Sequence, residues 1–160
     1  MNLVLIILFF FGLSQEDKKA QQLPADTLIR MERTDCFYTC QAYVVTITAD
    51  GLVTFEGKAN VRLIGKAQTR ISVDKVQALV AIFVKLKYFS LRDHYSRAED
   101  GCHISDGDTS STITAIVIGG RSKSVDRYGG CFLKKRHSLD GLMNLEEQID
   151  EIANTAQWIE

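Results

Sequence analysis

The chain has 160 residues, of which 46% are hydrophobic and 24% are charged, and its formal net charge is −1. This length and composition fit one globular domain and exclude an intrinsically disordered chain. Lys and Arg number 19 against 20 Asp and Glu, so no basic excess points to nucleic acid. We therefore expect a folded domain that binds no nucleic acid.

An unbroken apolar run, Leu3 to Phe11, lies near the start of the chain. It is too short for a spanning helix, which needs ~20 residues, but it has the length of a signal-peptide core. The small residues Gly12 and Ser14 follow, and then a polar stretch. We predict a signal peptide over 1–14, a polar tether over 15–26 and one domain over 27–160. A buried N-terminal strand or helix is the alternative. Export would place the mature protein in the periplasm or outside the cell, with no membrane span.

Four runs in the first half of the domain have the pattern of β-strands. They cover residues 28–33, 43–48, 52–56 and 61–71, and several alternate between apolar and polar side chains. Asp50-Gly51 separates the second and third runs, which is typical of a two-residue hairpin turn with positive φ at both positions. Gly65 interrupts the fourth run and is typical of a bulge.

The second half combines two helices with a further hairpin. Ser72 is a candidate N-cap for an amphipathic helix over 73–87, and a final helix is predicted over 139–154. Between them lies a polar loop, 93–111, and two strands, 112–118 and 121–127, joined by Gly119-Gly120. The predicted fold is α+β, with an antiparallel sheet of about six strands (order ββββ-α-ββ-α) and both helices on one face. The opposite face would be free, lined by Val44, Thr46, Thr48 and Thr54.

The opening of the domain resembles a known family. Cys36-Phe37-x-x-Cys40-x-x-Tyr43, the Asp50-Gly51 hairpin and the ending Ile149-Asp150…Trp158-Ile159 are similar to uncharacterised, mostly exported bacterial proteins that share a domain of unknown function. Family members commonly have Gly and then Cys-Pro in the opening stretch, where this chain has Tyr38, Thr39 and Gln41. The resemblance implies export and a single α+β domain. It implies no activity, cofactor or catalytic residue.

Four cysteines are an even number, which in an exported protein suggests two disulfides. Three pairings are possible, and we favour Cys36 with Cys40 and Cys102 with Cys131. The first bond needs a turn, because five extended residues would hold the Cα atoms ~13 Å apart, beyond disulfide range. Copper binding or thiol redox chemistry by Cys36 and Cys40 is the main alternative. His94, His103 and His137 are possible further ligands, but none lies in a metal-binding spacing.

No sequence motif assigns a catalytic residue, a metal site or a cofactor. The chain lacks the nucleophile elbow, the zinc-protease motif, the P-loop and the dinucleotide fingerprint. The acidic loop around Asp106 and Asp108 lacks the spacing of an EF-hand. A small hydrolase with an unrecognised site in 93–111 stays a third possibility.

We therefore expect an exported, non-catalytic binding or interaction module stabilised by disulfides. Its partner would be an unidentified protein or small molecule, and we expect a monomer. The residues expected to contact a partner are Phe37, Tyr38 and Tyr43, because aromatic side chains beside a disulfide turn suit recognition.

Overall fold

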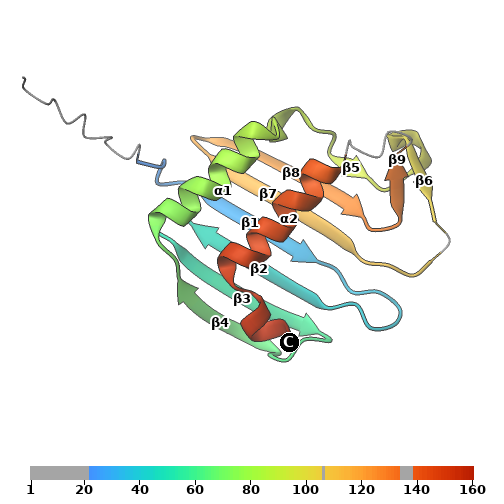
Figure 1. Cartoon of the computed structure of the whole chain (residues 1–160), viewed down its shortest axis with the longest axis horizontal. Coiled ribbons are helices and arrows are strands. Elements are labelled where there is room, and N and C mark those ends of the chain that lie inside the picture. The colour runs from blue at the N-terminus through green and yellow to red at the C-terminus, as the bar shows by residue number, and fades with distance from the viewer. Residues whose placement is uncertain (1–21, 106, 134–138) are drawn as a thin grey trace, which may run out of the picture.

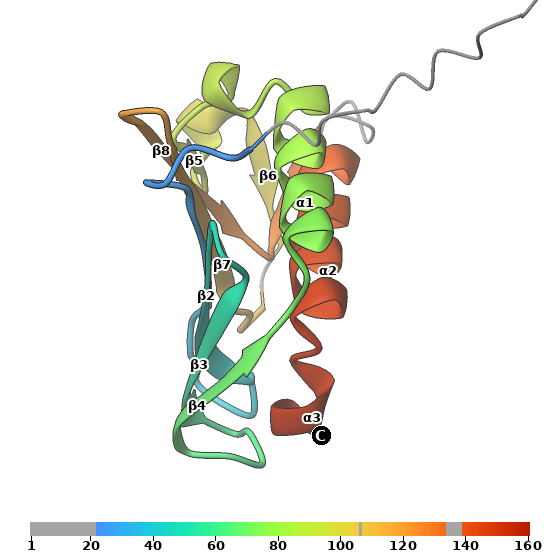
Figure 2. The ribbon, with the colours of Figure 1, turned by 90° about the vertical axis from the view of Figure 1, so that its left-hand side faces the viewer.

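The computed structural model describes residues 22–105, 107–133 and 139–160. A seven-stranded sheet forms one layer, with strand order β4-β3-β2-β1-β7-β8-β5. Two long helices form the second layer, on one face of that sheet (Figures 1 and 2). The fold class is α+β as predicted, and every pair of neighbouring strands is antiparallel except β5 with β8.

The first four strands follow the predicted order. They are β1 (Leu28–Arg33), β2 (Ala42–Thr48), β3 (Leu52–Ala59) and β4 (Gly65–Arg70). The β2–β3 turn differs from the prediction, because only Gly51 has a positive φ, +80°, and three residues separate the strands. The predicted bulge at Gly65 is also wrong: Gly65 begins β4 with a φ of +105°, and the register shift lies between Ala42 and Tyr43.

The second half contains more strands than predicted. After α1 (Val73–Lys85) and the 3-10 turn η1 (Tyr88–Ser90), the polar loop includes β5 (His94–Tyr95), η2 (Ala98–Asp100) and β6 (Cys102–Ile104). The predicted hairpin is β7 (Ser111–Ile118) and β8 (Arg121–Tyr128), and both Gly119 and Gly120 have positive φ. β9 (Cys131–Leu133) pairs with β6 as a separate two-stranded sheet. These extra strands have two or three residues each, too few to show an alternation of apolar and polar side chains in the sequence.

The predicted final helix, 139–154, is α2 (Asp140–Ala153), and a short further helix that was not predicted, α3 (Ala156–Ile159), follows it. Asn154 separates them with a φ of +54°. Ser72 is the N-cap residue of α1, but its side chain makes no capping hydrogen bond.

The core lies between the sheet and the two helices. Alternate residues of the central strands point into it, so that Ile29, Met31, Val45, Ile47 and Phe55 are fully buried. Trp158 of α3 stacks on Phe55 with ring centroids 4.9 Å apart. The other sheet face carries Thr46, which pairs with Arg30 and Thr54, and no described helix covers it (Figure 2).

The predicted signal peptide, 1–14, and most of the predicted tether lie outside the described residues. Within the tether, Asp26 accepts hydrogen bonds from the backbone N–H groups of Gly119 and Gly120, at 2.9 and 2.6 Å. These N–H groups lower the pKa of Asp26, that of Gly120 having the larger effect. The segment before β1 is therefore attached to the turn of the β7–β8 hairpin. None of the described helices is long and apolar enough to cross a membrane.

Candidate functional site

The loop between β1 and β2 is closed by a disulfide between Cys36 and Cys40. Their Cα atoms lie 5.5 Å apart, and the backbone N–H of Cys40 donates to Cys36 Sγ at 3.1 Å. The intervening residues therefore make the turn that the sequence required. With its ends fixed, the loop can adopt few backbone conformations.

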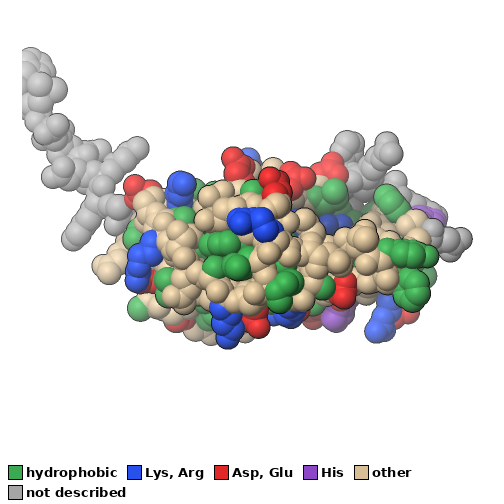
Figure 3. Space-filling model, turned by 90° about the horizontal axis from the view of Figure 1, so that it is seen from below, with side chains coloured by type: hydrophobic (Ala, Val, Ile, Leu, Met, Phe, Trp, Pro, Cys, Tyr) green, Lys and Arg blue, Asp and Glu red, His purple; other side chains and the backbone are tan. Residues whose placement is uncertain are grey.

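Two neighbouring aromatic side chains project from this loop into solvent. Phe37 is 84% exposed and Tyr38 is 73% exposed, and their rings pack edge to face with centroids 5.1 Å apart. Figure 3 shows hydrophobic side chains gathered at the end of the molecule where this loop lies. We call Phe37 and Tyr38, with the loop that the disulfide closes, the aromatic loop.

Polar contacts to distant segments hold the aromatic loop from two sides. The backbone N–H of Tyr38 donates to Asp108 Oδ2 at 2.9 Å, a residue of the segment between β6 and β7. The Asn60 side chain donates to the carbonyl of Cys40 at 3.0 Å from the β3–β4 connection. The loop is consequently fixed to the sheet as well as closed on itself.

Tyr43, the third predicted contact residue, has a different environment. It is 1% exposed, and its hydroxyl donates to Asp150 Oδ1 of α2 at 2.7 Å while accepting from Arg33 Nε at 2.9 Å. Arg33 also donates to Asp150 Oδ2 at 2.8 Å. Burial, reinforced by the neighbouring Asp150 carboxylate, raises the pKa of Tyr43. This side chain joins α2 to the sheet and is not accessible to a partner.

The second disulfide joins Cys102 of β6 to Cys131 of β9, with Cα atoms 5.0 Å apart. β6 and β9 lie toward the same end of the sheet as the β1–β2 loop (Figure 1). The structure thus contains the pairing that we favoured from the sequence. With their sulfurs bonded to each other, these cysteines are not thiolate ligands, and the described residues contain no group of three or more His, Cys, Asp or Glu that could hold a metal ion. His137 lies outside the described residues.

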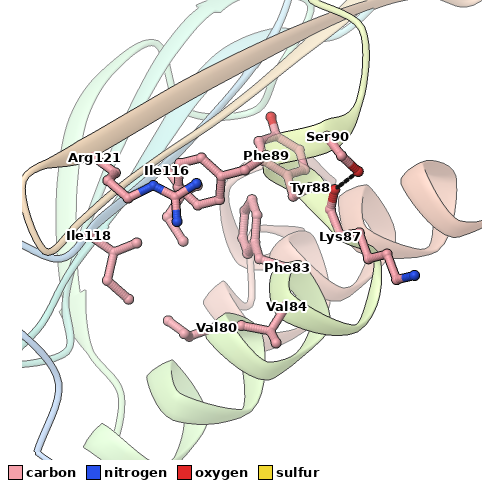
Figure 4. A pocket seen from close by; sticks show the side chains of 10 residues that line it. All are labelled: Val80, Phe83, Val84, Lys87, Tyr88, Phe89, Ser90, Ile116, Ile118 and Arg121. Atoms are coloured by element: carbon pink, nitrogen blue, oxygen red, sulfur yellow. Dashed lines mark hydrogen bonds between the residues drawn. The ribbon is translucent and has the colours of Figure 1, made fainter.

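Sequence reasoning missed an apolar cavity at the opposite end of the sheet. It has a volume of about 400 Å³ and lies between the C-terminal half of α1, the turn η1 and the β7–β8 hairpin (Figure 4). We call it the α1 groove. Its lining residues are Val80, Phe83, Val84, Lys87, Tyr88, Phe89, Ser90, Ile116, Ile118 and Arg121. The groove brings together three separate segments, so no local motif could have revealed it.

The chain matches a known protein family. A family described as a domain of unknown function (DUF6438) matches residues 27–153, and the chain belongs to this family. A search of curated proteins found no match. The matched region begins one residue before β1 and ends with the last residue of α2.

Proposed function

We propose that this protein is an exported, non-catalytic module that recognises a protein partner through its aromatic loop. The observation that carries the proposal is the exposure of Phe37 and Tyr38 on a loop that is covalently closed. Two adjacent exposed aromatic rings are unfavourable in water, and aromatic residues are enriched at the centres of protein interfaces.

The energetics of the loop suit binding. Complete burial of both rings would contribute roughly 3–6 kcal/mol to association. The disulfide and the contacts from Asp108 and Asn60 order the loop in advance, so that little conformational entropy remains to be lost on binding. A flexible loop with the same side chains would bind more weakly.

Substitution of the two rings tests the interface. We expect the wild-type protein, immobilised and exposed to extracts of its source cells, to retain a saturable partner that the Phe37→Ser/Tyr38→Ser variant loses. Ile64 and Val73 are exposed apolar residues elsewhere, 63% and 43%, and the Ile64→Ser/Val73→Ser variant is the matched control. Equal retention by all three proteins would contradict the proposal.

Export is supported by the apolar run at the start of the chain and by the two disulfides, which persist in oxidising compartments. We expect protein isolated from its source to begin at Gln15 and to contain no free thiol. Intact-mass analysis without reductant measures both. A chain that still begins at Met1, or one with four free thiols, would contradict export.

A further inference from the structure

We propose that the α1 groove binds a single-chain amphiphile with an anionic head group, such as a long-chain fatty acid. This site lies apart from the aromatic loop, and the proposal does not depend on the partner of that loop. Three features of the groove lead to it: an apolar floor, an open apolar extension and an excess of cations at its rim.

The floor of the groove is apolar because its one buried hydroxyl is already satisfied. Tyr88 OH donates to the carbonyl of Thr114 at 2.7 Å and also contacts Thr114 Oγ1 at 2.7 Å. The hydroxyl therefore points into the sheet, and the ring faces the groove. Phe83 packs edge to face on that ring, with centroids 4.7 Å apart. A floor of aromatic and aliphatic carbon favours a hydrocarbon chain over a polar ligand.

The groove continues along α1 into a second cavity of about 630 Å³. The two cavities share Val80, Val84 and Ile118, and the second extends to Leu23 and Pro24. Val84 is 71% exposed where they meet. An extended alkyl chain would cover this exposed side chain and bury its own methylene groups, which favours binding in proportion to the apolar area removed from water.

The charged side chains around the two cavities favour an anionic head group. Three cations, Lys85, Lys87 and Arg121, line the two cavities, and no acidic residue does so among the described part of the chain. Arg121 extends over the groove with its guanidinium carbon 4.0 Å from the centroid of the Phe89 ring, whereas Lys87 extends outward from the rim (Figure 4). In the described structure, neither Arg121 nor Lys87 forms an ion pair.

Asp26, from the segment before β1, lies beside the turn that precedes Arg121, but the two form no ion pair in the described structure. Asp26 is bound by the amides of Gly119 and Gly120, which satisfies its charge locally. The planar guanidinium stacked on Phe89 can still donate from its edge, the geometry in which Arg recognises a carboxylate. We therefore assign Arg121 to the head group and the apolar residues of the groove to the chain.

Calorimetric titration of the full chain with laurate tests the proposal, with dodecanol and butyrate as probes that lack the charge or the long chain. We expect saturable binding of laurate, weaker binding of dodecanol and none of butyrate. The Arg121→Gln variant should bind laurate about tenfold more weakly while its affinity for dodecanol is unchanged. Arg62→Gln, which removes an exposed Arg outside both cavities, should bind like the wild type.

A second pair of variants tests the apolar half of the site. Val84→Asp places an acid on exposed helix surface at the groove and should abolish binding of both laurate and dodecanol. Ile64→Asp makes the same change at an exposed site away from the groove and should have no effect. Absence of laurate binding to the wild type, or equal laurate affinity of the wild type and Arg121→Gln, would overturn the proposal.

Discussion

At the scale of single residues, the most consequential charge in the described core is Glu146 of α2. Its side chain is 2% exposed and accepts two hydrogen bonds from Arg127 of β8, at 2.7 and 2.5 Å. The two charges satisfy each other through bidentate geometry. Loss of either partner would leave the other buried without compensation, which is far more costly than loss of an exposed ion pair.

We expect Glu146→Ala to lower the free energy of unfolding by about 3–5 kcal/mol. Urea denaturation followed by circular dichroism measures this change. The matched control is Glu99→Ala, because Glu99 pairs with Arg97 on the surface, where both side chains are more than 70% exposed. That substitution should cost less than about 1 kcal/mol. Similar decreases in the free energy of unfolding for the two variants would show that burial adds nothing to the contribution of the Arg127–Glu146 pair.

The buried phenols of Tyr43 and Tyr88 predict a fall in stability at alkaline pH. Burial raises the pKa of both, whereas the unfolded chain releases each phenolic proton near pH 10. Below that pH both states are protonated, and the contribution to stability is complete. Above it only the unfolded state loses protons, so the free energy of unfolding decreases as pH rises.

Urea unfolding at about pH 9 and about pH 11 tests this linkage. We expect the decrease between the two to be smaller in the Tyr43→Phe/Tyr88→Phe variant, which has no phenol to titrate at either position. An identical decrease in the variant and the wild type would assign the alkaline loss to other groups.

At the scale of elements, the two disulfides close loops of different length. Cys36 and Cys40 are 4 residues apart, and Cys102 and Cys131 are 29 apart. By lowering the entropy of the unfolded chain, the first bond raises the free energy of unfolding by about 2 kcal/mol and the second by roughly 3.5 kcal/mol. The longer loop contributes more because its unfolded chain loses more conformations.

We therefore expect Cys102→Ala/Cys131→Ala to lower the melting temperature more than Cys36→Ala/Cys40→Ala, as measured by calorimetry. The Cys36→Ala/Cys40→Ala variant should instead show the larger loss of partner retention, because its aromatic loop is no longer closed. The reverse order of melting temperatures would contradict the loop-length argument.

The elements also show what the sequence can predict. β1 has the predicted bounds, and the other long strands, like α1, lie within about four residues of theirs. The strands β1, β2, β3 and β7 and the helix α1 have a clear apolar period, whereas β4 and β8 were located from the turns that precede them. The short strands β5, β6 and β9 have two or three residues and form through pairing with distant partners. The α1 groove was missed for the same reason, since Phe83, Ile116 and Arg121 meet only when α1 packs on the β7–β8 hairpin. Tyr43 alternates with Val45 and Ile47, so its burial follows from the strand period, whereas its contact with Asp150 of α2 depends on how the helix packs.

At the scale of the whole molecule, the two proposed surfaces lie at opposite ends of the sheet. The aromatic loop follows the last residue of β1, where the N–H of Thr34 donates to the carbonyl of Ser111. The α1 groove lies at the other end, where β7 finishes at Ile118. The two long helices together cover one face of the sheet (Figure 2). The aromatic loop and the α1 groove have no residue in common.

This separation predicts independent binding. Phe37→Ser/Tyr38→Ser should leave laurate affinity unchanged, and Arg121→Gln should leave partner retention unchanged. Calorimetry and retention measured on the same preparations test both statements. A change of more than about threefold in laurate affinity or in partner retention at the unaltered site would indicate coupling between the two ends.

The most direct test of the proposed function is photo-crosslinking in intact cultures of the source cells, with the medium and the cell envelope both analysed. A photoreactive side chain at position 37 would lie on the aromatic loop, and the same group at position 64 would lie on exposed surface elsewhere. We expect position 37 to give one dominant protein adduct and position 64 to give none of that mass. Adducts of equal yield at both positions, or no adduct at position 37, would contradict recognition through the aromatic loop.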